Sequence, residues 1–241
     1  MRATRIIFQR EFGAYVRQPF AWVIAAILLL VDGVLLQAFA MSGEQLSAGE
    51  LEKYFYFASG IAIAAGILLS FRLISEERQN HSMVLLTTSP VRDREIVVGK
   101  FFAALAYLAI LLVLTMYMPL LIKVEGKITM SQVLVGYLGM LLLGAATLAI
   151  GLFASSLTKN QLVAGVGALA MVVLMFLLFP FAKRLDAPVR PVLQDLDIWW
   201  IHYQNGFMKG VLNLKDLVYY LAVIYFFLLL AVKTLEAKRW S

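Results

Sequence analysis

Long apolar runs separated by short polar stretches dominate the pattern of the chain. The runs reach about 20 residues, which is the length that crosses a hydrocarbon core roughly 30 Å thick. They lack the strict alternation of barrel strands, so each run is predicted to be a helix whose backbone groups bond internally. Six membrane spans result, at residues 20–40, 54–74, 101–122, 132–155, 161–181 and 217–232.

The composition excludes an ordinary soluble domain. Of the 241 residues, 62% are hydrophobic and 15% are charged, and the mean hydropathy is +0.84. Soluble domains carry charged residues at roughly 25% of positions. The expected fold is therefore all-α, a polytopic membrane protein that forms a single transmembrane domain over residues 1–241.

The distribution of basic residues predicts the orientation of this domain. Six spans place both termini on one side, and 13 of the 21 Lys and Arg residues lie on that side. Five of the remaining eight fall in the long loop at 183–216. Because short cytoplasmic loops carry an excess of Lys and Arg, both termini are expected in the cytoplasm. No basic stretch indicates a nucleic-acid partner.

The residues before the first span have the periodicity of an amphipathic helix. Phe8, Phe12 and Tyr15 recur on one side, while Arg10 and Arg17 lie on the other. Such a helix lies in the membrane interface, and the proline at position 19 would end it. Residues 1–19 are therefore predicted to form an interfacial elbow helix, with a charged cytoplasmic tail as the alternative.

The titratable residues argue against catalysis in this chain. The two histidines, His81 and His202, fall in loops without a second histidine at helical spacing, and a lone loop histidine is expected to be solvated. There is no cysteine, and the Gly99-Lys100 pair lacks the remaining residues of a phosphate-binding loop. No catalytic, metal-binding or cofactor-binding residue is expected.

Asp32 is the one carboxylate well inside a predicted span. An unpaired charge there costs a few kcal/mol. One interpretation makes Asp32 part of a substrate path or gate. The other is a structural carboxylate that reaches the outer interface or caps another helix.

The loop at 75–100 carries its own pattern. Ser75, Glu76 and Glu77 resemble a helix start, an apolar patch follows at 83–86, and Pro90 ends it. A short amphipathic helix of this kind suits docking on a partner protein. Packing against the chain's own spans is the alternative, and the pattern alone favours neither.

Two further segments allow both a functional and a structural interpretation. The fourth span has a stripe of small residues that predicts close helix packing, either at a dimer or gating surface or inside one bundle. The stripe consists of Gly144, Thr147, Gly151 and Ser155. The loop at 183–216 contains Trp199 and Trp200, which suit an interfacial segment because such side chains prefer the headgroup level. It could also be an aromatic belt that only anchors the sixth span.

Five segments together resemble one known family, the ABC-2 type transporter permeases, and more closely those of the gliding-motility type. They are REFGAYVRQPFAWV at 10–23, ISEERQNHSMVLLTTSPV at 74–91, REIVVGKFF at 94–102, YLGMLLLGAATLAIGLFASSLTKNQ at 137–161 and LLLAVKTLEAKRW at 228–240. Their order and spacing carry the resemblance over nearly the whole chain. One departure is His81-Ser82, where the family commonly has Gly-Thr.

The resemblance implies the membrane subunit of an ATP-driven exporter in a bacterial inner membrane. Two permease chains, as a homodimer or with a paralogue, would pair with two ATPase subunits that hold the ATP and Mg²⁺. These ATPases would dock on the loop at 75–100. The coupling residues carried over by position are Glu76, Glu77, Leu85, Leu86 and Pro90, while Gly99 and Lys100 would mark the restart of the third span.

The resemblance also bears on the outer side. Helices that dip into the outer leaflet and close the exit are frequent at this position in the family, which would make Trp199 and Trp200 part of a lid, and an extracytoplasmic auxiliary protein is implied. A different class of function shares the same topology: a membrane anchor or scaffold for a motility or envelope assembly, without transport.

Overall fold

The computed structural model describes residues 2–35, 37–38, 47–80, 91–125, 128–186 and 189–239. These residues form helices and turns without a strand, which confirms the all-α class. The α-helices are α1 (Arg2–Arg17), α2 (Pro19–Leu35), α3 (Ser47–Ser70), α4 (Ser75–Gln79), α6 (Asp93–Thr115), α7 (Tyr117–Glu125), α8 (Met130–Leu157), α9 (Gln161–Ala182), α10 (Val189–Asp195) and α11 (Leu214–Arg239). Two short turns, η2 (Trp200–Gln204) and η3 (Phe207–Lys209), precede α11.

Five of the described helices are long and apolar enough to cross a membrane. They run over Gly49–Gln79, Asp93–Lys123, Met130–Leu157, Gln161–Ala182 and Leu214–Lys238. The helices α1 and α2 pass the same test only as a pair, and they are bent by 65° at their junction. The chain is thus a multi-pass membrane protein, and its described residues provide five spans, or six if the bent pair counts as one.

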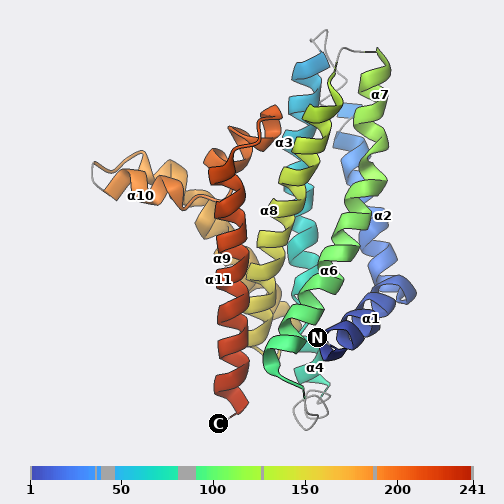
Figure 1. The fold of residues 1–241 in the computed structure, drawn as a ribbon, viewed down its shortest axis with the longest axis vertical. Helices are drawn as coiled ribbons and strands as arrows, with labels where there is room; N and C mark the ends of the chain where they lie inside the picture. Colours follow the sequence, from blue (N-terminus) through green and yellow to red (C-terminus); the bar gives the residue numbers. More distant parts are fainter. Residues whose placement is uncertain are drawn as a thin grey trace.

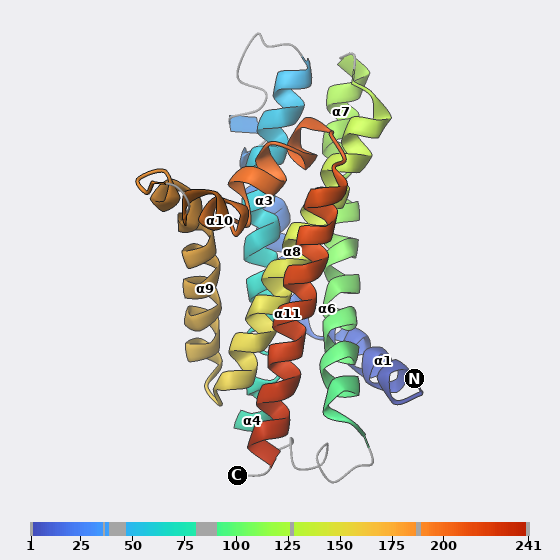
Figure 2. The same ribbon diagram turned by 60° about the vertical axis from the view of Figure 1, so that its left-hand side comes forward.

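Helix α8 is the centre of the bundle. It packs against α3, α6, α9 and α11, and 67% of its most apolar stretch is buried, against 17% for α9 and α11. Figures 1 and 2 show α3 and α11 beside it, with α1 lying across the lower end of the bundle. The apolar residues of α9 and α11 are therefore largely left uncovered by the rest of the described chain.

The helix ends follow local capping rules. Pro19 is the first residue of α2, where its missing N–H is not needed. The side chain of Asn160 accepts hydrogen bonds from the backbone N–H groups of Leu162 and Val163 and so caps α9. Thr129 and Gln132 form a capping box at the start of α8.

Several helices extend beyond the predicted apolar runs. Helix α6 begins at Asp93 instead of residue 101, α3 begins at Ser47 instead of residue 54, and α11 continues to Arg239 instead of residue 232. Hydropathy marks only the part of a helix that lies in hydrocarbon, whereas the helix continues through polar ends. The last eight residues of the predicted loop at 75–100 are consequently the first turns of α6.

The small-residue stripe of α8 packs inside this chain. A Cβ added at Gly66 of α3 would clash with the Thr147 side chain and lie 2.7 Å from the Gly144 carbonyl oxygen. A Cβ at Gly151 would clash with the Ser70 hydroxyl. The stripe thus lets α3 and α8 approach closely, and it is covered by α3 rather than exposed on a surface that a second copy could reach.

Candidate functional site

The segment after α3 is fixed to the end of α8 by one serine hydroxyl. Ser155 Oγ accepts hydrogen bonds from the backbone N–H groups of Ile74 and Ser75, at 3.1 and 2.9 Å. It also donates to the carbonyl oxygen of Phe71 at 2.9 Å. Ser155 is fully buried, so these bonds are shielded from water and hold the start of α4 rigidly.

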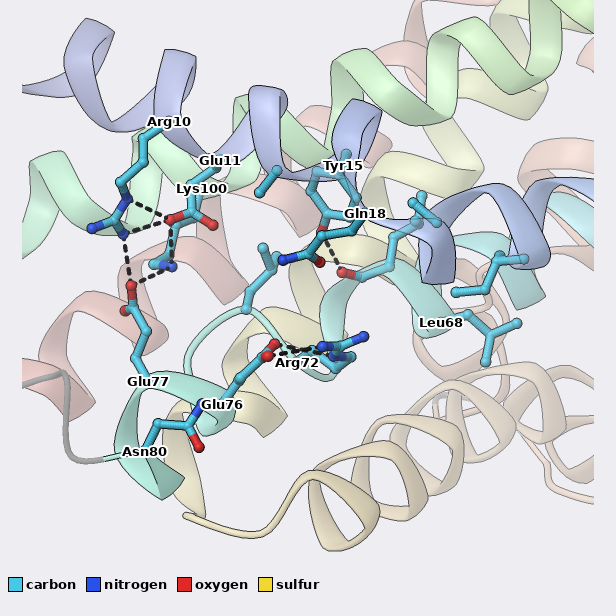
Figure 3. A pocket seen from close by; sticks show the side chains of 15 residues that line it. Arg10, Glu11, Tyr15, Gln18, Leu68, Arg72, Glu76, Glu77, Asn80 and Lys100 are labelled. Carbon is cyan, nitrogen blue, oxygen red and sulfur yellow. Dashed lines mark hydrogen bonds and ion pairs between the residues drawn. The ribbon is translucent and has the colours of Figure 1, made fainter.

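Four charged side chains join α4 to α1 and α6. Glu77 of α4 lies 2.7 Å from the Arg10 guanidinium of α1 and 3.0 Å from the Lys100 ammonium of α6. Glu11 of α1 pairs with the same Lys100 at 3.1 Å and with Arg10. We call Arg10, Glu11, Glu77 and Lys100 the junction cluster; Figure 3 shows it where the three helices meet.

The junction cluster is electrically balanced, which explains how it is tolerated in this place. The side chain of Lys100 is 2% exposed and those of Glu11 and Glu77 are 15% exposed. Burying a charge is costly unless it is paired and hydrogen-bonded. Two carboxylates around one buried ammonium, with Arg10 as the second cation, meet that requirement. Breaking one of these ion pairs would leave a largely buried charge without its partner. The pairs therefore hold helices α1, α4 and α6 together.

Helix α4 also caps the end of α8. The guanidinium of Arg78 donates to the carbonyl oxygen of Ser156 at 2.7 Å. From α11, the ammonium of Lys238 donates to the same oxygen at 3.1 Å and to that of Leu157 at 2.7 Å. Cations at a helix C-terminus satisfy its last carbonyl groups and stabilise its dipole. One end of the bundle thus brings together α1, α4, α6, α8 and α11.

The predicted coupling residues fall partly within the described chain. Glu77 is in the junction cluster, and Glu76 pairs with Arg72 one turn earlier, at 2.8 Å. Leu85, Leu86 and Pro90 lie outside the described residues, as does His81.

Sequence reasoning missed the other members of the junction. Arg10 was predicted on the polar side of α1, and Lys100 as a marker of the third span. The sequence does contain one indication of this site at Gly99-Lys100: a lysine next to an apolar helical run needs a charged partner. Gly99 shows where the partner helix comes from: a Cβ there would lie 2.9 Å from the Ile7 side chain of α1. The glycine therefore allows α1 to cross α6 closely beside Lys100.

Asp32 points into the bundle near the opposite end. It is 2% exposed and lines a cavity of about 30 Å³ together with Thr115. Nearby, the hydroxyl of Tyr137 lies 2.9 Å from that of Tyr54 and 3.1 Å from that of Thr115. A cavity of this size has room for about one water molecule. Asp32 is thus buried beside these hydroxyl groups, between α2, α3, α6 and α8, in a cavity whose other walls are mostly apolar.

The segment at 199–209, which precedes α11 and which we call the aromatic segment, is packed into the bundle. Trp199 is 4% exposed, and its indole N–H donates to the Ser59 hydroxyl of α3 at 2.9 Å. Its ring lies 5.2 Å from that of Tyr56 and 5.5 Å from that of Phe176. Trp200 is half-buried and stacks on Phe179 at 5.7 Å. This segment covers α3 and α9 in the manner of a core element.

His202 is a correction to the sequence analysis. It was expected to be solvated, but it is 1% exposed. Its Nδ1 lies 2.8 Å from the Asp216 carboxylate, its Nε2 lies 3.1 Å from the carbonyl oxygen of Asp195, and its ring stacks on Tyr219 at 3.7 Å. The residue therefore ties the aromatic segment to the start of α11, which no local sequence pattern indicates.

Within the described residues, no group of three or more His, Cys, Asp or Glu side chains could hold a metal ion. The charged groups at the junction are paired with one another.

Comparison with known proteins adds a family to this geometry. A family model described as ABC-2 family transporter protein matches residues 5–231. A search of curated proteins finds no match. The matched range includes the junction cluster, Asp32 and the aromatic segment.

Proposed function

The chain belongs to the ABC-2 family of transporter proteins, and on that premise we propose that it is the permease subunit of an ATP-driven exporter. In this proposal the chain performs no catalysis. A separate ATPase subunit binds ATP and Mg²⁺ and docks on the loop that joins α4 to α6. Two permease chains, identical or paralogous, form the path across the membrane and alternate between inward-open and outward-open states.

The observation that carries the proposal is the attachment of α4 to several helices at once. A cytoplasmic motor can move membrane helices only through a stiff element that connects them. Helix α4 directly precedes the segment at 81–90 and is bonded to α1 and α6 through Glu77. It is bonded to α8 through Arg78 and Ser155. A push on α4 would therefore reach the centre of the bundle through these contacts.

Further assignments belong to the same proposal and are supported by the charge pattern and by the sequence resemblance. We place the chain in a bacterial inner membrane with both termini in the cytoplasm, because most Lys and Arg residues are on that side. We keep the gliding-motility type, with an extracytoplasmic auxiliary protein, as the closer assignment. The aromatic segment with Trp199 and Trp200 is proposed to close the exit at the outer side, and Asp32 to lie beside the path when the bundle opens.

Purification and ATPase measurement test the proposal. The tagged chain is isolated from its native membrane in a mild detergent, its partners are identified, and their ATP hydrolysis is measured. Leu85→Asp combined with Leu86→Asp is expected to reduce that hydrolysis at least about tenfold, because two charges in an apolar contact cost more than 1.4 kcal/mol.

A matched control is the double change Val211→Asp with Leu212→Asp. These two residues are also an adjacent apolar pair and are about half exposed. They directly precede α11, whose opposite end bonds to the end of α8 near the junction cluster. Hydrolysis should be unchanged in this variant. Purification without any ATPase across several detergents would contradict the exporter proposal and favour a membrane scaffold.

A further inference from the structure

A cavity of about 350 Å³ lies between α1, α2, α3 and α4, beside the junction cluster. Figure 3 shows its lining, with charged groups on the side of α4 and apolar ones toward Leu68. The polar part includes Gln18, Arg72, Glu76 and Asn80. The apolar part includes Ala21, Ile24 and Leu68. One wall of the cavity thus suits a charged group and the other a hydrocarbon chain.

The place of the cavity in the fold matches the boundary between headgroups and acyl chains. Helix α1 is bent 65° from α2 and lies across the bundle, as interfacial helices do. The cavity lies at the bend, where Gln18 and then Ala21 and Ile24 of α2 line it, so its apolar wall continues along α2. There Val23 and Ile27 are more than half exposed. A molecule with its polar end in the cavity could therefore rest its apolar part on a membrane-facing surface.

The charges of the cavity select a particular kind of polar end. Three cations line it, and each is paired with a carboxylate that also lines it, so the formal charges sum to zero. An anionic headgroup would have to displace a carboxylate without compensation. A headgroup that carries both signs could instead replace both partners of one ion pair at once.

One ion pair is accessible for such an exchange. The side chains of Arg72 and Glu76 are 23% and 34% exposed. In the junction cluster Arg10 is 51% exposed, but its carboxylate partners are only 15% exposed and Lys100 is 2% exposed. Among the described ion pairs that line the cavity, the two partners are therefore accessible together only at Arg72 and Glu76. The Arg72–Glu76 pair is thus the ion pair of the cavity that a headgroup with both charges can reach. A guanidinium binds phosphate with two parallel hydrogen bonds, and a carboxylate accepts from an ammonium.

We propose that this cavity binds a zwitterionic phospholipid of the surrounding leaflet, with its phosphate at Arg72 and its ammonium at Glu76. The cavity is at the small end of ligand sites, which span about 300–1,000 Å³, so it holds the headgroup. The acyl chains leave past Ile24 and Leu68 along α2. This inference does not rest on transport, since it concerns binding to the chain itself.

Native mass spectrometry of the purified full chain tests the proposal. The chain is delipidated in detergent and loaded with palmitoyl-oleoyl phosphatidylethanolamine or with phosphatidylglycerol of the same acyl chains. The ethanolamine lipid should be retained about fivefold more, which corresponds to roughly 1 kcal/mol for one partly exposed charge pair. Equal retention of the two lipids, or a preference for phosphatidylglycerol, would overturn the proposal.

Two variants locate the bound lipid. Leu68→Trp fills the cavity and should remove most of the retained ethanolamine lipid. Leu174→Trp in α9 makes the same change at a side chain that is 66% exposed and does not line the cavity, and it should leave retention unchanged. Equal effects of the two changes would show that the lipid is only part of the surrounding shell.

A third variant tests the headgroup contact. Arg72→Gln combined with Glu76→Gln removes both charges; the change at Glu76 keeps the side-chain length, whereas the change at Arg72 shortens the side chain and leaves a polar end. The preference between the two lipids should then disappear. A preference that persists in this variant would place the headgroup elsewhere and refute the assignment to Arg72 and Glu76. Because no ATPase is measured, failure here leaves the exporter proposal untouched.

Discussion

The ammonium of Lys100 in α6 lies 3.0 Å from the carboxylate of Glu77 in α4, with only 2% of the lysine side chain exposed. The same ammonium pairs with Glu11 of α1 at 3.1 Å. One buried cation therefore joins three helices that are separate in the sequence. The consequences of this and of three other contacts can be measured.

Replacing Lys100 with methionine should destabilise the protein by about 3 kcal/mol, because two largely buried carboxylates lose their shared cation. Thermal unfolding of the purified chain, followed by tryptophan fluorescence, measures the effect. Lys215→Met is the matched control, since Lys215 and its partner Asp195 are 67% and 54% exposed. That change should cost less than about 1 kcal/mol. Equal destabilisation by the two changes would show that the junction cluster adds nothing.

Gly66→Ala should weaken the contact between α3 and α8. The added methyl would clash with Thr147 and lie 2.7 Å from a backbone carbonyl oxygen, which cannot move aside as a flexible side chain can. A loss of about 1–3 kcal/mol in unfolding free energy is expected. Gly60→Ala in the same helix has nothing within 4 Å of its added Cβ and should be neutral or slightly stabilising. A neutral Gly66→Ala would mean that the two helices are further apart than described.

The indole of Trp199 and the hydroxyl of Ser59 should be energetically coupled. A double-mutant cycle with Trp199→Phe and Ser59→Ala is expected to give a coupling energy of about 1 kcal/mol, the usual net value of a buried hydrogen bond. Trp200→Phe is the control, because within the described residues the Trp200 indole N–H has no hydrogen-bond partner. A coupling energy near zero for Trp199 and Ser59 would contradict the packing of the aromatic segment.

Trp199→Ala is a poor test of an exit lid, because Trp199 is buried and its loss would destabilise the bundle. Removing a buried tryptophan costs about 3–5 kcal/mol, so lost transport would reflect lost structure. Trp199→Phe keeps most of the packing and is the more informative change in a transport assay. If the aromatic segment acts as a lid, this variant should alter transport while the chain still assembles.

The stability of the aromatic segment should increase as the pH falls from 7 to 5. Burial raises the pKa of Asp197 to about 6 from an ordinary value of 3.8, although backbone N–H groups of Ile201 and Trp199 donate to it. The folded chain therefore binds the proton more tightly than the unfolded chain. The stability that this proton contributes is fully present below the pKa of Asp197 in the unfolded chain, and it is lost as the pH rises through 6.

The expected gain between pH 7 and pH 5 is about 1 kcal/mol. Melting temperatures of the chain and of Asp197→Asn, measured at both pH values, isolate this contribution, because every other titrating group is common to both. A pH response that is the same in the two proteins would show that Asp197 titrates as it does in water.

The sequence predicts the fold far better than the site. Apolar runs such as 132–155 locate a span because the membrane imposes one length and one polarity on every crossing helix. The junction cluster depends instead on which face α1 presents to α6, and that follows from the bend at Gln18. Nothing near Arg10 in the sequence indicates that its partner is 67 residues away. His202 shows the same limit, because a loop position gives no information on burial.

The bend between α1 and α2 has a mechanical consequence. Helix α1 has 16 residues and is thus about 24 Å long. It packs closely on α6 near its start, where a Cβ added at Gly99 would lie 3.1 Å from the carbonyl oxygen of Thr4, and Glu11 pairs with Lys100 further along. A displacement of α6 would therefore carry α1 with it, and the bend at Gln18 is where that displacement would reach α2.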